Sequence, residues 1–151
     1  MTAIARLYEE LYNLAIIDDP LRLWLRGSWD ASSDQYALVR IWNGRAPKGY
    51  EPRLLTIGEP NEEADAATET FLADGNQAVI RLHLFTELDG RYYVGAIGVE
   101  HLHRVFHRKP MELDGFTLID GVVRYVTANE DPDGKSYHTI AEYRASVAAV
   151  A

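Results

Sequence analysis

The sequence contains no cysteine. This absence excludes disulfide bonds, thiolate nucleophiles, and zinc or iron–sulfur sites held by cysteine ligands. A chain without cysteine is compatible with a reducing compartment, and we expect a cytoplasmic protein.

Basic residues are also few: the sequence has 15 Lys and Arg but 23 Asp and Glu, which gives a net charge of −8. Binding to phosphates needs a basic field, so we expect neither a nucleic-acid partner nor an anionic membrane surface. No apolar run approaches the roughly 20 residues that cross a bilayer. The N-terminal segment carries Arg6, Glu9 and Glu10, which is unlike a signal peptide.

The chain of 151 residues is long enough to bury its own core, and we expect a single domain over residues 1–151. Apolar residues at three- and four-residue spacing predict a helix over residues 2–17. Asp19 can cap a second, short helix over residues 21–26, with Pro20 at its first position. The middle of the chain adds two predicted strands and one segment that fits either a helix or a strand: residues 36–42, 53–57 and 59–74.

Residues 77–106 contain the strongest local signal, two β-type runs that meet at Asp89-Gly90. An Asp-Gly pair between alternating residues is typical of a β-hairpin. In that register, His83 lies opposite Ala96, and the polar side chains face a hollow above small residues. The opposite face of the first run is apolar and is expected to face the core.

The sequence of the last third of the chain indicates a second hairpin and a final helix. Residues 116–119 and 122–127 flank Asp120-Gly121, and residues 137–150 fit a C-terminal helix. Helices at both ends and strands between them indicate an α+β fold with a curved, mostly antiparallel sheet wrapped on the N-terminal helices.

Two stretches resemble the nuclear transport factor 2-like superfamily, which includes ketosteroid isomerases and polyketide cyclases. The first runs from Leu7-Tyr8-Glu9-Glu10-Leu11 to the acidic turn Ile17-Asp18-Asp19-Pro20, and the second is the segment Gly115 to Val126. The resemblance covers roughly residues 3–130. It implies a cone-shaped sheet with an apolar pocket, and members often form homodimers.

The resemblance also implies candidate catalytic groups. Tyr8 or Tyr12 lies where isomerase-like members place a pocket tyrosine, and Asp30 or Asp34 lies near the position of a general base in some members. In the central hairpin, Arg81 could stabilise an oxyanion, while His83 could transfer a proton. The alternative interpretation of the hairpin charges is a partly exposed sheet face with salt bridges.

The candidate substrate-binding residues combine aromatic side chains with one carboxylate near Arg81. They are Tyr8, Trp42, Phe85, Glu100 and Tyr125. Aromatic side chains can line a pocket for a flat ligand, although they more often pack in a core or an interface.

His101 and His103 suggest a different chemistry. In a regular strand both side chains share one face, and residues 95–103 match the opening of a cupin metal motif. The position of the cupin ligand glutamate is taken by His107 or Arg108, and His83 points to the opposite face in this register. A third histidine ligand would therefore need a β-bulge.

These patterns together predict a cofactor-independent enzyme of the cyclase, isomerase or dehydratase type. Its partner would be a small, hydrophobic, carbonyl-bearing molecule, and its assembly a homodimer. The alternatives are a ligand-binding or dimerisation module without catalysis, and a cupin-like metal-binding barrel centred on His101 and His103.

Overall fold

The computed structural model describes residues 3–26, 40–44, 53–58, 77–89, 91–132 and 134–149. The described helices are α1 (Ala3–Ile16), α2 (Asp19–Arg26) and α4 (Arg91–Phe106). The described strands are β1 (Ile41–Asn43), β2 (Leu54–Ile57), β3 (Gln77–Glu87), β4 (Glu112–Leu113), β5 (Phe116–Glu130) and β6 (Ser136–Ala149). None of these helices is long and apolar enough to span a membrane.

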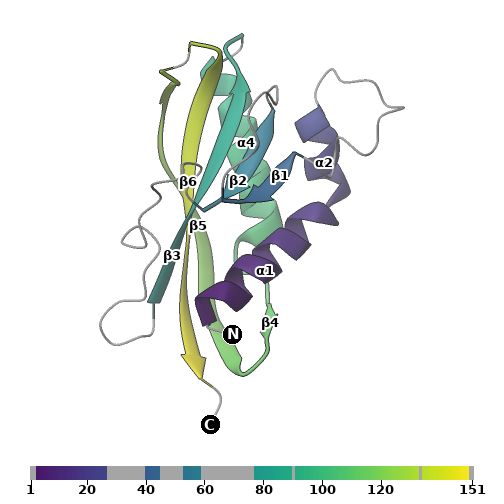
Figure 1. The fold of residues 1–151 in the computed structure, drawn as a ribbon, viewed down its shortest axis with the longest axis vertical. Helices are drawn as coiled ribbons and strands as arrows, with labels where there is room; N and C mark the ends of the chain where they lie inside the picture. The colour runs from purple at the N-terminus through teal and green to yellow at the C-terminus, as the bar shows by residue number, and fades with distance from the viewer. Residues whose placement is uncertain are drawn as a thin grey trace.

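The described strands form one sheet in the order β1-β2-β3-β6-β5-β4. β1 and β2 are parallel, and every other neighbouring pair is antiparallel. The three long strands β3, β6 and β5 make the body of the sheet, which Figure 1 shows as a curved ribbon. This arrangement confirms the predicted α+β class and the mostly antiparallel, curved sheet.

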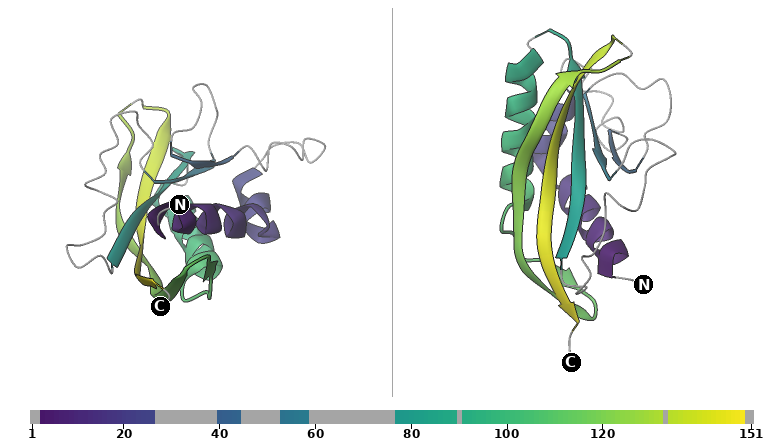
Figure 2. Two further views of the ribbon diagram at one scale, coloured as in Figure 1. Left: turned by 60° about the horizontal axis from the view of Figure 1, so that its bottom comes forward. Right: turned by 90° about the vertical axis from the view of Figure 1, so that its left-hand side faces the viewer.

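All three described helices pack on the same side of the sheet (Figure 2). The helical faces carry Leu7, Leu11, Leu102 and Phe106 into a core that is closed on the other side by alternate residues of β3. Those β3 residues are Ala78, Ile80, Leu82 and Leu84, all fully buried. They are the residues that the alternation in the sequence predicts for the core face.

The two N-terminal helices confirm their prediction, because Leu7, Leu11 and Ala15 recur every four residues and are all buried. The cap of α2 differs from the expectation. Asp18, rather than Asp19, accepts a hydrogen bond from the Leu21 amide at 2.9 Å through its Oδ2 atom. This is the geometry of an N-cap side chain that satisfies a free amide of the first turn.

The second half of the predicted central hairpin is wrong, because Arg91–Phe106 is the helix α4. Its buried positions are Gly95, Gly98, Leu102, Val105 and Phe106, which follow helical spacing. Two of these five positions are glycines, which carry no apolar side chain, so the helical period is hidden in a plot of hydrophobicity. A Cβ atom at Gly98 would lie 2.6 Å from Trp24 Cη2 and 2.7 Å from Leu84 Cδ1, so the glycine allows α4 to pack closely on the sheet.

The predicted hairpin at Asp120-Gly121 is also wrong, because β5 runs without a turn from Phe116 to Glu130. The register against β6 shifts between Ile119 and Val122, and Asp120 has a φ of 50°. An Asp-Gly pair suits such a β-bulge as well as a two-residue turn, since both need backbone in the left-handed region.

The predicted C-terminal helix is wrong as well, because residues 136–149 form β6. Ala141, Tyr143, Ala145 and Val147 are buried at every second position, which is the period of a strand. The alanines in this segment favour a helix locally, but pairing with β3 on one side and β5 on the other overrides that preference.

Candidate interaction surface

The outer face of the sheet, opposite the helices, brings together two histidines that are far apart in the sequence. His83 on β3 and His138 on β6 lie with Nδ1 and Nε2 2.7 Å apart. Phe85 stacks on His138, with ring centroids 4.3 Å apart and planes 17° apart. The predicted site residues Arg81, His83 and Phe85 therefore do share a face of β3, but their neighbours come from β6.

Both histidines are held in the neutral form. Burial and the neighbouring His138 and Arg81 lower the pKa of His83 to about 3, and burial lowers the pKa of His138 to about 4. A proton donor near pH 7 needs a pKa close to that value. The pair is therefore suited to joining two strands by a hydrogen bond rather than to moving protons at neutral pH.

Glu142 on β6 lies directly opposite Arg81 in the strand register. The sequence-based register instead predicts Gly98 at that position, with the carboxylate of Glu100 diagonal to Arg81. Its buried carboxylate accepts hydrogen bonds from Arg124 at 2.7 Å and from Arg144 at 3.2 Å. Glu100 is exposed on α4 and takes no part in this face. His138 and Glu142 were missed because residues 137–150 were read as a helix, although their alternation indicates a strand.

The histidine pair of the metal hypothesis lies on α4. Residues two positions apart on a helix point about 200° apart, so His101 and His103 cannot share a face as they would in a strand. His101 Nδ1 lies 3.0 Å from a guanidinium nitrogen of Arg104, and the His101 ring packs beside Trp24. His103 instead stacks on His107. Within the described residues, no group of three or more His, Asp or Glu side chains could hold a metal ion.

The remaining predicted site residues lie elsewhere. Tyr8 and Tyr12 on α1 are partly buried against the hydrophobic core, and Trp42 lies on the short strand β1. Asp30 and Asp34 lie outside the described residues. Among the described residues, Arg81 and His83 lie on the outer face of the sheet and Tyr12 packs against the core, so these three do not form one site. The role of each predicted catalytic residue stays a prediction.

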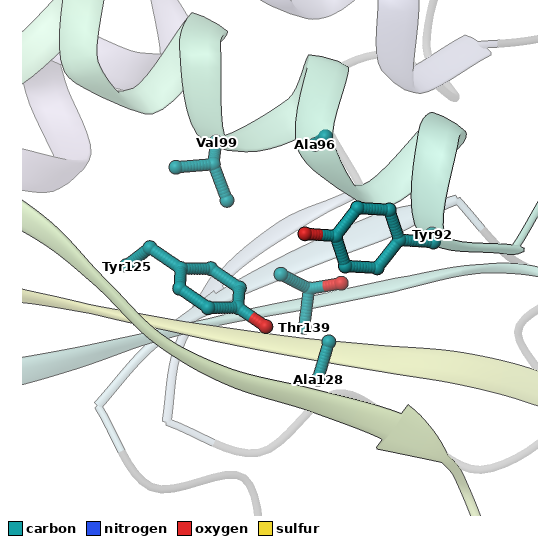
Figure 3. A pocket seen from close by; sticks show the side chains of 6 residues that line it. All are labelled: Tyr92, Ala96, Val99, Tyr125, Ala128 and Thr139. Carbon is teal, nitrogen blue, oxygen red and sulfur yellow. The ribbon is translucent and has the colours of Figure 1, made fainter.

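A pocket of about 180 Å³ lies between α4 and the two strands β5 and β6 (Figure 3). Residues at helical spacing on α4 form one wall, and residues of both strands form the other. The lining residues are Tyr92, Ala96, Val99, Tyr125, Ala128 and Thr139. Only Tyr125 was predicted to bind a ligand, since a strand over residues 91–106 would not place Tyr92, Ala96 and Val99 on one face.

Two tyrosines stand at the rim of this pocket. Tyr92 is 67% exposed and Tyr125 is 46% exposed, which is high for aromatic side chains. Partial burial, together with the phenols of Tyr92 and Tyr137, raises the pKa of Tyr125 above its ordinary value. The rim is therefore aromatic, with phenol groups at its tips.

Thr139 lies at the base of the pocket. Its side chain is 1% exposed, and its Oγ1 atom has no hydrogen-bond partner among the residues that the structure describes. A buried hydroxyl without a partner loses the hydrogen bonds that it makes to water, which costs free energy. The pocket is therefore apolar along its walls, and the Thr139 hydroxyl is covered at its base.

Comparison with known proteins gives a consistent result. The family model described as Tail completion protein gp17 matches residues 26–148. A chain in the solved structure titled "Virion of native gene transfer agent (GTA) particle" is 15% identical, with 97% of each chain covered and a TM-score of 0.65. The structure of the bacteriophage SPP1 gp17 protein is also 15% identical, covering 95% of this chain and 90% of that chain, with a TM-score of 0.56. No curated protein matches the sequence.

These matches contradict the resemblance to the nuclear transport factor 2-like superfamily. The N-terminal helices on which it partly rested do exist, but the final hairpin is one continuous strand with a bulge. The prediction of a small-molecule cyclase, isomerase or dehydratase is wrong, and its alternatives, a ligand-binding module and a cupin-like metal barrel, fit no better.

Proposed function

The chain belongs to the family of the tail completion protein gp17, and on that premise we propose that it is a structural protein of a virion tail. In place of a small hydrophobic ligand and a homodimer, its proposed partners are the neighbouring proteins of the particle. It would be made in the cytoplasm of the producing cell and leave the cell within the particle.

The family match carries this proposal. Residues 26–148 include α4 and every described strand except the last residue of β6, so the match spans the sheet and the pocket beside it. The two solved structures support the same direction, because one belongs to a virion and the other to a bacteriophage protein, and this chain shares their fold over nearly its full length.

The surface suits binding to proteins. Tyr92, Ile119 and Tyr125 are large apolar side chains that remain well exposed in the isolated chain. Aromatic residues are enriched in protein–protein interfaces and often dominate their binding energy. The pocket between α4 and β5 is the size of one or two side chains, which is below the range of about 300–1,000 Å³ typical of small-molecule sites.

Deletion of the coding sequence in a host that produces the particle tests the proposal. We expect purified particles with incomplete tails and a loss of infectivity or gene transfer of at least a hundredfold, restored by the chain supplied from a plasmid. A plasmid that carries an early stop codon is the matched control. Particles with complete tails and full activity in the absence of the chain would contradict the proposal.

A further inference from the structure

Among the described strands, β5 is at the edge of the sheet for most of its length. β4 pairs only with Phe116 and Thr117. Further along the strand, the Arg108 amide donates to the Gly121 carbonyl at 2.6 Å, and the Val123 amide donates to His107 Nδ1 at 3.1 Å. From Tyr125 to Glu130, no described residue pairs with the side of β5 that faces away from β6.

The register shows which main-chain groups face this open edge. The Val123 amide points away from β6, since it donates to His107. In an antiparallel ladder, outward-pointing residues recur at every second position. Val123, Tyr125 and Ala128 lie opposite Tyr143, Ala141 and Thr139, which are themselves every second residue of β6. The main-chain groups of Tyr125 and Ala128 therefore face the open edge, with the bulge at Val126 absorbing the extra residue.

The same two residues also line the pocket. The side chains of Tyr125 and Ala128 point toward α4, where they meet Tyr92, Ala96 and Val99 (Figure 3). A strand added to the edge of β5 would direct alternate side chains to that same face. One of them would lie beside Ala128, at the mouth of the pocket.

We propose that the β5 edge from Tyr125 to Glu130 and the adjoining pocket form a docking site for an extended segment of another protein of the particle. The segment pairs with β5 as an additional strand and inserts a Tyr or Trp side chain between Tyr92 and Tyr125. The inference rests on the proposed function, since it assigns the surface through which the tail protein binds a neighbour.

The chemistry of the site selects this occupant. The main-chain donors and acceptors of an edge strand form a row with which another extended backbone can pair. The apolar walls bind an aromatic body, and the polar tip of Tyr or Trp stays at the rim beside Tyr92 and Tyr125, which are both exposed. The net charge of −8 favours a segment without acidic residues.

A second copy of this chain is a poorer occupant. The other edge of the described sheet is β1, which has only three residues and is too short to match the open part of β5. Pairing of β5 with β5 of another copy would place residues of the pocket itself, Tyr125 and Ala128, at the shared edge. A second copy also carries the same net charge of −8, which opposes close pairing of two such edges.

Particles produced without the chain serve as the probe. Purified chain is added back, and restored infectivity or gene transfer is measured together with the amount of chain bound per particle. Tyr92→Ala removes one wall of the pocket, and Tyr93→Ala is its matched control, because Tyr93 is the next residue, is 72% exposed and does not line the pocket. We expect Tyr92→Ala to lose at least tenfold in restoration and Tyr93→Ala to match the unchanged chain.

Ala128→Pro tests the strand addition separately. It removes an amide that faces the open edge and leaves the ladder to β6 in place, as edge strands allow. Ala128→Ser keeps the amide and is the control. We expect Ala128→Pro to bind at least tenfold less and Ala128→Ser to bind normally, with thermal melting confirming that all variants are folded.

Normal restoration by both Tyr92→Ala and Ala128→Pro would overturn the inference, and so would a loss in only one of them, because the proposed segment uses both features. Failure of the unchanged chain to bind the deficient particles would instead overturn the proposed function itself. A photo-reactive p-benzoylphenylalanine in place of Asn129 identifies the occupant. A cross-link to another particle protein supports the proposal, whereas a cross-link to a second copy of the chain contradicts it.

Discussion

His83 Nδ1 lies 2.7 Å from His138 Nε2, and this contact joins β3 to β6 on the face of the sheet opposite the helices. Two ring nitrogens at this distance share one proton, so one donates and the other accepts. Adding a second proton would turn the two nitrogens into opposing donors. The geometry therefore requires that the pair stay neutral, in agreement with the lowered pKa values of both histidines.

Because both histidines of this pair have lowered pKa values, we expect the free energy of unfolding to decrease as the pH falls. The unfolded histidines titrate near 6.5, while the folded ones titrate near 3 and near 4. The unfolded chain therefore binds more protons below about pH 6.5, and the stabilisation is fully present above that pH and is lost progressively toward pH 4. Urea unfolding at pH 7.5, 6, 5 and 4.5 measures the decline.

His138→Gln tests whether the pair causes this decline. Glutamine keeps a hydrogen-bonding group opposite His83 but removes one group that titrates. We expect the loss of unfolding free energy between pH 7 and pH 5 to shrink by about 1 kcal/mol after allowance for partial exposure of the ring. His103→Gln, an exposed histidine on α4, is the matched control. Identical pH profiles for His138→Gln and the unchanged chain would show that the pair does not govern acid stability.

Gly98→Ala is expected to destabilise the fold by up to about 2 kcal/mol. The added methyl group would contact Trp24 and Leu84 at less than 3 Å, and overpacking of this kind costs about 1–3 kcal/mol. The better helix propensity of alanine returns roughly 1 kcal/mol. Urea unfolding measures the net change, and Glu100→Ala at an exposed position of the same helix should stay within about 0.5 kcal/mol.

A double variant separates close packing from other effects of Gly98→Ala. Trp24→Phe shortens the side chain that the new methyl group would contact. We expect the double variant to be less destabilised than the sum of the two single variants, since the collision is relieved. Additive losses would mean that contact with Trp24 is not the reason for glycine at this position.

Asp18 has two functions that can be separated by two substitutions. It caps α2, and its carboxylate accepts two hydrogen bonds from Arg104 on α4 at 2.8 and 2.7 Å. The Arg104 hydrogen bond is the main reason that the pKa of Asp18 is lowered. Asp18→Asn keeps the cap and loses only the ion pair, whereas Asp18→Ala loses both.

We expect Asp18→Ala to be more destabilised than Asp18→Asn by about 1 kcal/mol, the usual value of an N-cap. The loss in Asp18→Asn alone should stay below about 1 kcal/mol, since the Arg104 side chain is partly exposed. Urea unfolding at neutral pH distinguishes the two variants. Equal stability of Asp18→Asn and Asp18→Ala would exclude a capping role for this residue.

Local sequence patterns predict the correct element where the buried positions carry apolar side chains at regular spacing. The spacing of Leu7, Leu11 and Ala15 identifies α1, and the alternation through residues 78–84 identifies both β3 and its core face. Patterns failed where glycine or alanine occupies the buried positions. Gly95 and Gly98 leave gaps in the apolar spacing of α4, and the alanines of β6 have a high helix propensity although the segment is a strand.

The candidate site depended on those same two elements. The pocket is formed by α4, β5 and β6. The sequence predicts a strand in place of α4 and a helix in place of β6, so it could not predict that their residues line one pocket. The pairing of His83 with His138 spans 55 residues and depends on the β3–β6 register. A register of this kind is fixed by the packing of the whole sheet, and no local signal in either segment indicates it.

The presence of the chain in the particle tail is the central claim, and quantitative mass spectrometry tests it most directly. Particles are purified, separated into heads and tails, and digested. The account predicts that peptides of this chain are recovered with the tail fraction at a fixed number of copies per particle. Their absence from purified particles, with the chain remaining in the cell extract, would contradict the assignment of this protein to the virion tail.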